Sequence, residues 1–221
     1  MKKTIFILSI LLAANFSYAQ MPEKFVKAME ALVPAVDTTH SMSGLAELAN
    51  AFERIANAET NQWLPFYYAA LCNVSAGTMV GAGGDMMAAK ADKTDPYADT
   101  ADDLLKKAEA LMKDNSEIFV VKKQIATLRM LGDPMSRYMT FGPEATAMLE
   151  AAKKLNPDNP RVYLLDAQDK FYTPEQFGGS KEEAKILFDK AMTLYGTFKP
   201  ETSISPTWGK NQVQYFLSQY K

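Results

Sequence analysis

From position 145 the chain reads ATAMLEAAKKLNPDNP, which contains the end of one predicted helix and the beginning of the next. Three residues at positions i, i+4 and i+7 form an apolar stripe with small residues at both ends. The stripe consists of Ala145, Leu149 and Ala152. Pro157 cannot continue the helical hydrogen bonds, and Asn159 before a proline is typical of the N-cap of a new helix. The segment therefore predicts a helical hairpin with a very short turn.

The same stripe occurs at three other places in the chain. The copies are Ala51/Ile55/Ala58, Ala101/Leu105/Ala108 and Ala184/Phe188/Ala191. Spacing alone is weak evidence in a chain rich in alanine, but a polar turn follows at a similar offset, as at 113–116. The recurring stripe and turn predict several helical hairpins that stack through small side chains.

This pattern resembles the tetratricopeptide repeat (TPR) family, whose unit of about 34 residues is a helix, a turn and a second helix. Residues 184–191 match the second-helix positions of that unit, and Pro157 matches the turn between units. The chain is also similar to exported bacterial proteins of this class, in which the runs at 63–66 and 178–184 recur. The resemblance implies an all-α fold, with antiparallel helical hairpins stacked as a short TPR-like α-solenoid and a C-terminal capping helix at 209–220.

The first nineteen residues have the features of a secretory signal peptide. Two lysines precede an apolar run at 5–14, and Ser17-Tyr18-Ala19 is a small-x-small cleavage site. The apolar run is too short to span a bilayer. We therefore expect 1–19 to be a signal peptide, 20–221 to be a single TPR-like helical repeat domain, and the product to be periplasmic or secreted without a transmembrane anchor.

Composition gives further limits on function. The chain has 26 acidic and 24 basic residues, a net charge of −2, and the two signs are interspersed, so we expect no nucleic-acid partner. Cys72 is the only cysteine, which rules out an internal disulfide. Its apolar neighbours predict a buried, unreactive thiol.

The expected elements are all helical, because no segment alternates between apolar and polar residues with period two. The expected helices are 22–33, 44–59, 65–80, 98–113, 116–131, 142–155, 160–172, 180–195 and 209–220. Gly81 to Pro96 is expected to be the main loop, with one helical turn near 86–90, and 196–207 to be a linker or irregular crossing. Ser180 and Glu183 fit a capping box, in which each side chain accepts a hydrogen bond from the other residue's backbone.

No motif predicts catalysis. The glycine-rich run at 81–85 follows a helix and lacks an adjacent lysine and hydroxyl residue, so it does not fit a phosphate loop. His40 is the sole histidine, and an enzyme would require it to meet an acid and a hydroxyl in the fold. We therefore expect a non-enzymatic protein with no metal and no cofactor.

The preferred interpretation is a protein-protein interaction scaffold, whose groove binds a peptide or a partner protein of the cell envelope. Four aromatic residues crowd the run from 63 to 68 and cannot all face one core. In the TPR family the first helix of each unit lines the concave face, which implies further contacts on 116–131 and 160–172. The candidate partner-binding residues are Tyr67, Tyr68, Gln124, Arg161, Gln168 and Tyr172.

The alternative is an extracytoplasmic small-ligand receptor or transport accessory with an apolar pocket between helices. Methionine side chains adapt to varied ligands, and the chain contains thirteen of them. The candidate pocket residues are Met79, Met86, Met130 and Met135. A closed apolar cavity would favour the receptor, whereas an open concave face with exposed aromatic side chains would favour the scaffold.

Overall fold

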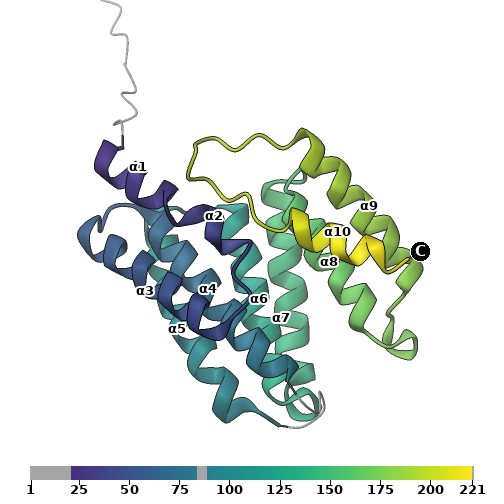
Figure 1. Ribbon diagram of the computed structural model, residues 1–221. Helices are drawn as coiled ribbons and strands as arrows, with labels where there is room; N and C mark the ends of the chain where they lie inside the picture. Colours follow the sequence, from purple (N-terminus) through teal and green to yellow (C-terminus); the bar gives the residue numbers. More distant parts are fainter. Residues whose placement is uncertain (1–20, 84–88, 221) are drawn as a thin grey trace, which may run out of the picture.

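The computed structural model describes residues 21–83 and 89–220, and its regular structure there is entirely helical (Figure 1). The predicted signal peptide and Met86 lie outside these residues. The helices are α1 (Glu23–Glu30), α2 (Val33–Val36), α3 (Met42–Ala58), α4 (Trp63–Ala82), α5 (Ala91–Leu111), α6 (Ser116–Gly132), α7 (Pro134–Leu155), α8 (Pro160–Tyr172), the short 3₁₀ turn η1 (Glu175–Phe177), α9 (Lys181–Thr197) and α10 (Lys210–Ser218). In the described part of the chain, no helix has the length and hydropathy needed to cross a bilayer.

The helices stack as antiparallel neighbours, which confirms the predicted all-α hairpin architecture. From α3 to α7 each helix packs on the next one in sequence, and α8 packs mainly on α9. The α8–α9 pair leans away from α7, so the N-terminal half of α7 projects beyond it (Figure 1). α4 is apolar around its whole circumference because it is covered by α3, α5 and α6.

Three of the four predicted stripes lie in the core. The stripe residues of α5, α7 and α9 are all buried. The stripe proposed for α3 is wrong, since Ala51 and Ile55 are only partly buried and Ala58 is exposed. The buried face of α3 is instead built around Phe52 and Ala56, one residue later, and it places the large Phe52 ring against Tyr68 of α4.

Two helices begin earlier than predicted. α5 begins at Ala91, although Pro96 lies within it, and α4 ends at Ala82. Residues 81–82 and 91–96 of the expected 81–96 loop are therefore helical. The Lys90 ammonium donates to the carbonyls of Gly81 and Gly83 at 2.8 and 2.6 Å, which satisfies acceptors at the end of α4 and fixes the start of α5.

α7 begins at Pro134 rather than at residue 142. Asp133 acts as its N-cap, with the Asp133 carboxylate accepting the Ser136 N–H, and Pro134 occupies the first turn, where its missing N–H is harmless. Arg137 then joins the first turns of α7 and α5 through a two-pronged ion pair with Asp95, at 2.7 and 2.9 Å. The early start adds two turns to α7 beyond the predicted hairpin.

Smaller differences occur at the two ends of the stack. The helix expected at 22–33 is interrupted after Glu30 and resumes as α2. The capping box at the start of α9 is half present: the Ser180 hydroxyl accepts the Glu183 N–H, but the Glu183 carboxylate pairs with Lys170 at 2.7 Å instead. An ion pair to α8 thus replaces the reciprocal backbone contact.

The irregular crossing expected at 196–207 is observed at 198–209, between the end of α9 and the start of α10. It leaves α9, extends to the N-terminal end of α4 and returns to α10 (Figure 1). Ile204 and Trp208 from this segment are buried in the core. Gly209 has a φ of 103°, a conformation that glycine adopts without strain, and its N–H donates to Asp37 at 2.9 Å. The crossing segment therefore connects the two ends of the helical stack.

Candidate functional site

A buried ion pair lies where α6, α8 and the crossing segment meet. The Arg161 side chain is 1 % exposed and donates from Nε and Nη2 to the carboxylate of Glu117, with distances of 2.7 to 3.0 Å. The same carboxylate accepts the side-chain amide of Asn159 at 2.7 Å and the hydroxyl of Tyr67 at 3.1 Å. The negative charge is thus compensated by a cation and two neutral donors.

This cluster holds the crossing segment in place. The indole N–H of Trp208 donates to the Tyr67 hydroxyl at 2.8 Å, and the Tyr195 hydroxyl donates to the carbonyl of Trp208 at 2.8 Å. The Arg161 guanidinium lies over the rings of Phe198 and Trp208. Burial raises the pKa of Tyr67 and of Tyr195, so both phenols stay protonated and remain hydrogen-bond donors.

A polar cleft of about 610 Å³ adjoins this cluster, and Glu117 and Arg161 are among its lining residues. It lies at the turns between α5 and α6 and between α7 and α8, and the crossing segment forms its other wall. The lining residues are Trp63, Asp114, Asn115, Ser116, Glu117, Leu155, Asn156, Asp158, Arg161, Leu194, Thr197, Phe198, Lys199, Glu201, Ser205 and Pro206. We call this the polar cleft.

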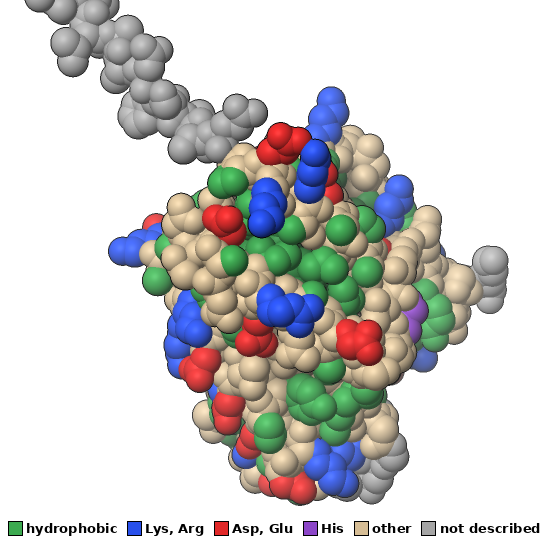
Figure 2. Space-filling model, turned by 60° about the vertical axis from the view of Figure 1, so that its left-hand side comes forward, with side chains coloured by type: hydrophobic (Ala, Val, Ile, Leu, Met, Phe, Trp, Pro, Cys, Tyr) green, Lys and Arg blue, Asp and Glu red, His purple; other side chains and the backbone are tan. Residues whose placement is uncertain are grey.

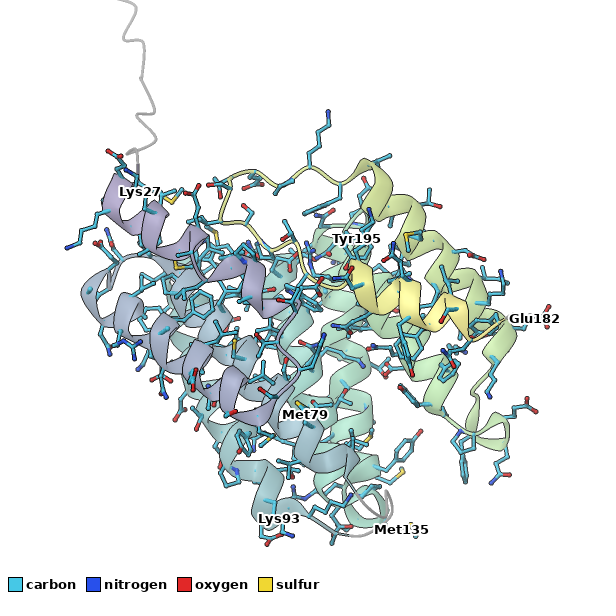
Figure 3. All side chains as sticks on the ribbon, viewed as in Figure 1. Lys27, Met79, Lys93, Met135, Glu182 and Tyr195 are labelled. Carbon is cyan, nitrogen blue, oxygen red and sulfur yellow. The ribbon has the colours of Figure 1, made fainter. Side chains whose placement is uncertain are left out.

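A second accessible feature is an apolar face on the first turns of α7. Met135, Tyr138 and Met139 lie at positions i, i+3 and i+4, and their exposed fractions are 77, 52 and 81 %. Met135 lies near the side of the molecule where α5 and α7 begin, as the labels of Met135 and Lys93 show (Figure 3). These three residues form what we call the α7 surface. Exposed apolar groups of this kind commonly mark a ligand or partner site.

The six candidate partner-binding residues fall into two groups. Tyr67, Tyr68 and Arg161 are buried and bonded within the chain, with the Tyr68 hydroxyl donating to the carbonyl of Ile204 at 2.9 Å. In this structure the crossing segment covers them, so they are not accessible to a partner. The crossing segment therefore occupies the part of the inner face that the scaffold interpretation assigned to a peptide.

The other three candidates lie nearer the surface, on α6 and α8. Gln168 contacts Gln212 of α10 at 3.3 Å, and Tyr172 is largely exposed and packs edge to face on Phe216. Oε1 of Gln124 is buried and has no hydrogen-bond partner among the described residues. The structure does not bring these three side chains into one cleft with the buried three.

Neither of the two hollows found among the described residues is the methionine pocket expected from the sequence, and Met86 lies outside those residues. The polar cleft has no methionine in its lining, and neither has a second hollow beside α5, which is lined by Lys106, Glu109, Ala110, Lys113 and Asp114. Met79 and Met135 are exposed, on α4 and α7, and their labels are well separated in Figure 3. Met135 is exposed because α7 begins at Pro134, eight residues earlier than expected, which places Met135 on the first turn of a helix rather than in a pocket between helices.

The remaining polar candidates stay isolated. His40 is exposed in the loop before α3, and the structure places no metal-binding group of three His, Cys, Asp or Glu side chains in 21–83 or 89–220. Cys72 is buried, as predicted, and burial raises the pKa of its thiol to about 12. Basic and acidic side chains are interspersed on the face that Figure 2 shows.

These features define an all-helical protein of stacked hairpins, closed by its own crossing segment, with a polar cleft at one end and an apolar surface at the other. No protein-family model matches the chain, and no curated protein matches it. A solved structure, the HusA haemophore from Porphyromonas gingivalis, matches with a TM-score of 0.76 and 32% sequence identity, over 89% of this chain and 92% of that chain. The chain belongs to the same family as HusA. The TPR assignment of its hairpins stays a prediction.

Proposed function

We propose that this protein is an exported, non-enzymatic binding protein whose ligand is haem. The observation that carries the proposal is the similarity to a haemophore, at 32% identity over nine-tenths of both chains. The predicted signal peptide supports export. The proposal corresponds to the small-ligand alternative rather than to the peptide scaffold, because the crossing segment buries Tyr67, Tyr68 and Arg161.

The α7 surface is the feature best suited to such a ligand. A porphyrin presents two broad apolar faces, which pack well against methionine and tyrosine side chains. The thioether sulfur of methionine and the phenol of tyrosine are both ligand types that haem iron accepts in proteins. Met135 and Met139 offer two such sulfurs one turn apart, and both are open to solvent.

Absorbance titration of haemin into the purified protein tests this proposal. We expect a saturable change in the Soret band for the wild type. The double variant Met135→Ser/Met139→Ser should bind about tenfold more weakly or worse, because it removes apolar area that the ligand would cover. The matched control Ile186→Ser/Tyr215→Ser removes side chains of similar exposure on α9 and α10 and should bind as the wild type does.

Two outcomes count against the proposal. If the wild type shows only a linear, non-saturating change, haem binding is wrong. If the two double variants bind equally well, the ligand does not use the α7 surface.

A further inference from the structure

The polar cleft is separate from the α7 surface and has a chemistry of its own. It lies at the opposite end of the hairpins, at the turns before α6 and α8, whereas Met135 lies at the start of α7. Its volume of about 610 Å³ is within the range of roughly 300–1,000 Å³ that is common for ligand sites. The floor is rigid, because the Glu117 carboxylate and the Arg161 guanidinium are held by the buried cluster.

The walls of the cleft carry an excess of negative charge. Arg161 and Glu117 neutralise each other on the floor. The remaining charged lining residues are Asp114, Asp158, Glu201 and Lys199. The three acids are exposed, and none of them forms an ion pair with another described residue. The cleft therefore presents three carboxylates to one ammonium group.

Two further features favour a cation. α5, α7 and α9 all end at this cleft, so the partial negative charges of three helix C-termini point toward it. Three helix N-termini also meet the cleft: those of α6 and α8 are capped, since the side chains of Asn115 and Asn159 accept their first free N–H groups, whereas α4 begins at Trp63 without a side-chain cap. Trp63, half-buried at the edge of the cleft, adds an aromatic ring of the kind that attracts ammonium and guanidinium groups.

The spacing of the acids favours an organic cation over a metal ion. No three of the His, Cys, Asp and Glu side chains in the described ranges approach closely enough to hold a metal. Phosphate-rich partners such as nucleic acid or an anionic membrane surface would be repelled. A lysine or arginine side chain matches the dispersed carboxylates, because its cationic group can donate several hydrogen bonds.

We propose that the polar cleft binds a basic segment of a partner protein, with a lysine or arginine side chain placed among Asp114, Asp158 and Glu201. This site does not depend on the proposed haem function. It gives the protein a second contact surface, so that a ligand on α7 and a partner at the cleft are held at the same time.

The test measures fluorescence anisotropy of two labelled pentapeptides, Gly-Lys-Gly-Arg-Gly and Gly-Glu-Gly-Asp-Gly, with the full chain. The cleft variant is Asp114→Asn/Asp158→Asn/Glu201→Gln. Asn is tolerated at 114, where φ is 51°. The control variant, Glu47→Gln/Glu144→Gln/Glu182→Gln, removes the same charge from exposed helix positions outside the cleft.

We expect the wild type and the control to bind the basic peptide equally within a factor of two, and the cleft variant to bind it about tenfold more weakly. None should bind the acidic peptide. Equal losses in the cleft and control variants, or equal binding of both peptides by the wild type, would overturn the proposal. Haemin titration of the cleft variant should match the wild type, so failure of this site and failure of the haem proposal are read separately.

Discussion

Replacing Arg161 by methionine is expected to destabilise the protein strongly. Methionine keeps much of the side-chain volume between Phe198 and Trp208, so the main loss is electrostatic. The variant leaves the Glu117 carboxylate without its cation and without three hydrogen bonds of 2.7 to 3.0 Å. Removal of one partner of a buried ion pair typically costs about 3–5 kcal/mol. The donors of Asn159 and Tyr67 remain, which places the expected loss near about 3 kcal/mol.

Urea unfolding followed by circular dichroism measures this loss, and a thermal melt should show a fall of about 6–12 °C for a domain of this size. Arg54→Met is the matched control, because Arg54 is exposed, and its effect should stay within about 0.5 kcal/mol. Adding Glu117→Gln to Arg161→Met removes the orphaned charge and should restore about 1–2 kcal/mol. A loss below about 1 kcal/mol for Arg161→Met would refute the view that this cluster holds the crossing segment.

Three other perturbations test separate parts of the account. Ala152→Asp puts an unpaired charge into a fully buried stripe and should cost about 3–5 kcal/mol in urea unfolding; an unchanged melting temperature would remove this stripe from the core. Cys72 should resist a thiol reagent at pH 8 until denaturant is added, because burial raises its pKa to about 12; fast labelling of the folded protein would contradict this. The Arg137 guanidinium lowers the pKa of the Asp95 carboxyl, so the folded state releases this proton more readily than the unfolded state. The stabilisation by this pair is therefore present at neutral pH and is lost as the pH falls through the lowered pKa. Asp95→Asn should cost about 0.5–1 kcal/mol at pH 7, and the difference from wild type should vanish once the pH falls below the lowered pKa of Asp95; a difference that stays constant with pH would contradict this.

The sequence predicted the hairpin stack because its determinants are local. Small residues at i, i+4 and i+7, followed by a proline or a capping asparagine, specify a helix face and its end within about sixteen residues. Asn159 was predicted as an N-cap and has that role, with its Oδ1 accepting the Arg161 N–H at 3.0 Å. Where the signal was spacing alone, as at Ala51, the prediction failed by one residue.

The buried cluster depends instead on contacts between residues far apart in the chain. Glu117 and Arg161 are 44 residues apart, and Tyr67 and Trp208 are 141 apart. Arg161 was singled out as a surface contact, since an arginine on an expected concave face has no local signal for burial. An acid in the first turn of a helix, such as Glu117, is ordinarily explained by the helix dipole alone. Only the tertiary fold brings them together.

The α7 surface was missed for a related reason. The sequence analysis placed the helix start at 142, which left Met135, Tyr138 and Met139 in a connecting segment with no common face. The Asp133-Pro134 pair is an N-cap signal that would have revealed the face. Two turns of α7 precede Pro143 in the structure.

Methyl NMR of methionine tests the central claim most directly. In protein labelled with ¹³C at the methionine methyl groups, haemin is paramagnetic and broadens signals near its iron, whereas a gallium porphyrin shifts them without broadening. We predict that Met135 and Met139 broaden first with haemin and shift with the gallium analogue, while buried Met29 on α1 is unaffected. Uniform broadening of all methionines, or selective broadening that leaves both α7 methionines unchanged, would contradict the account.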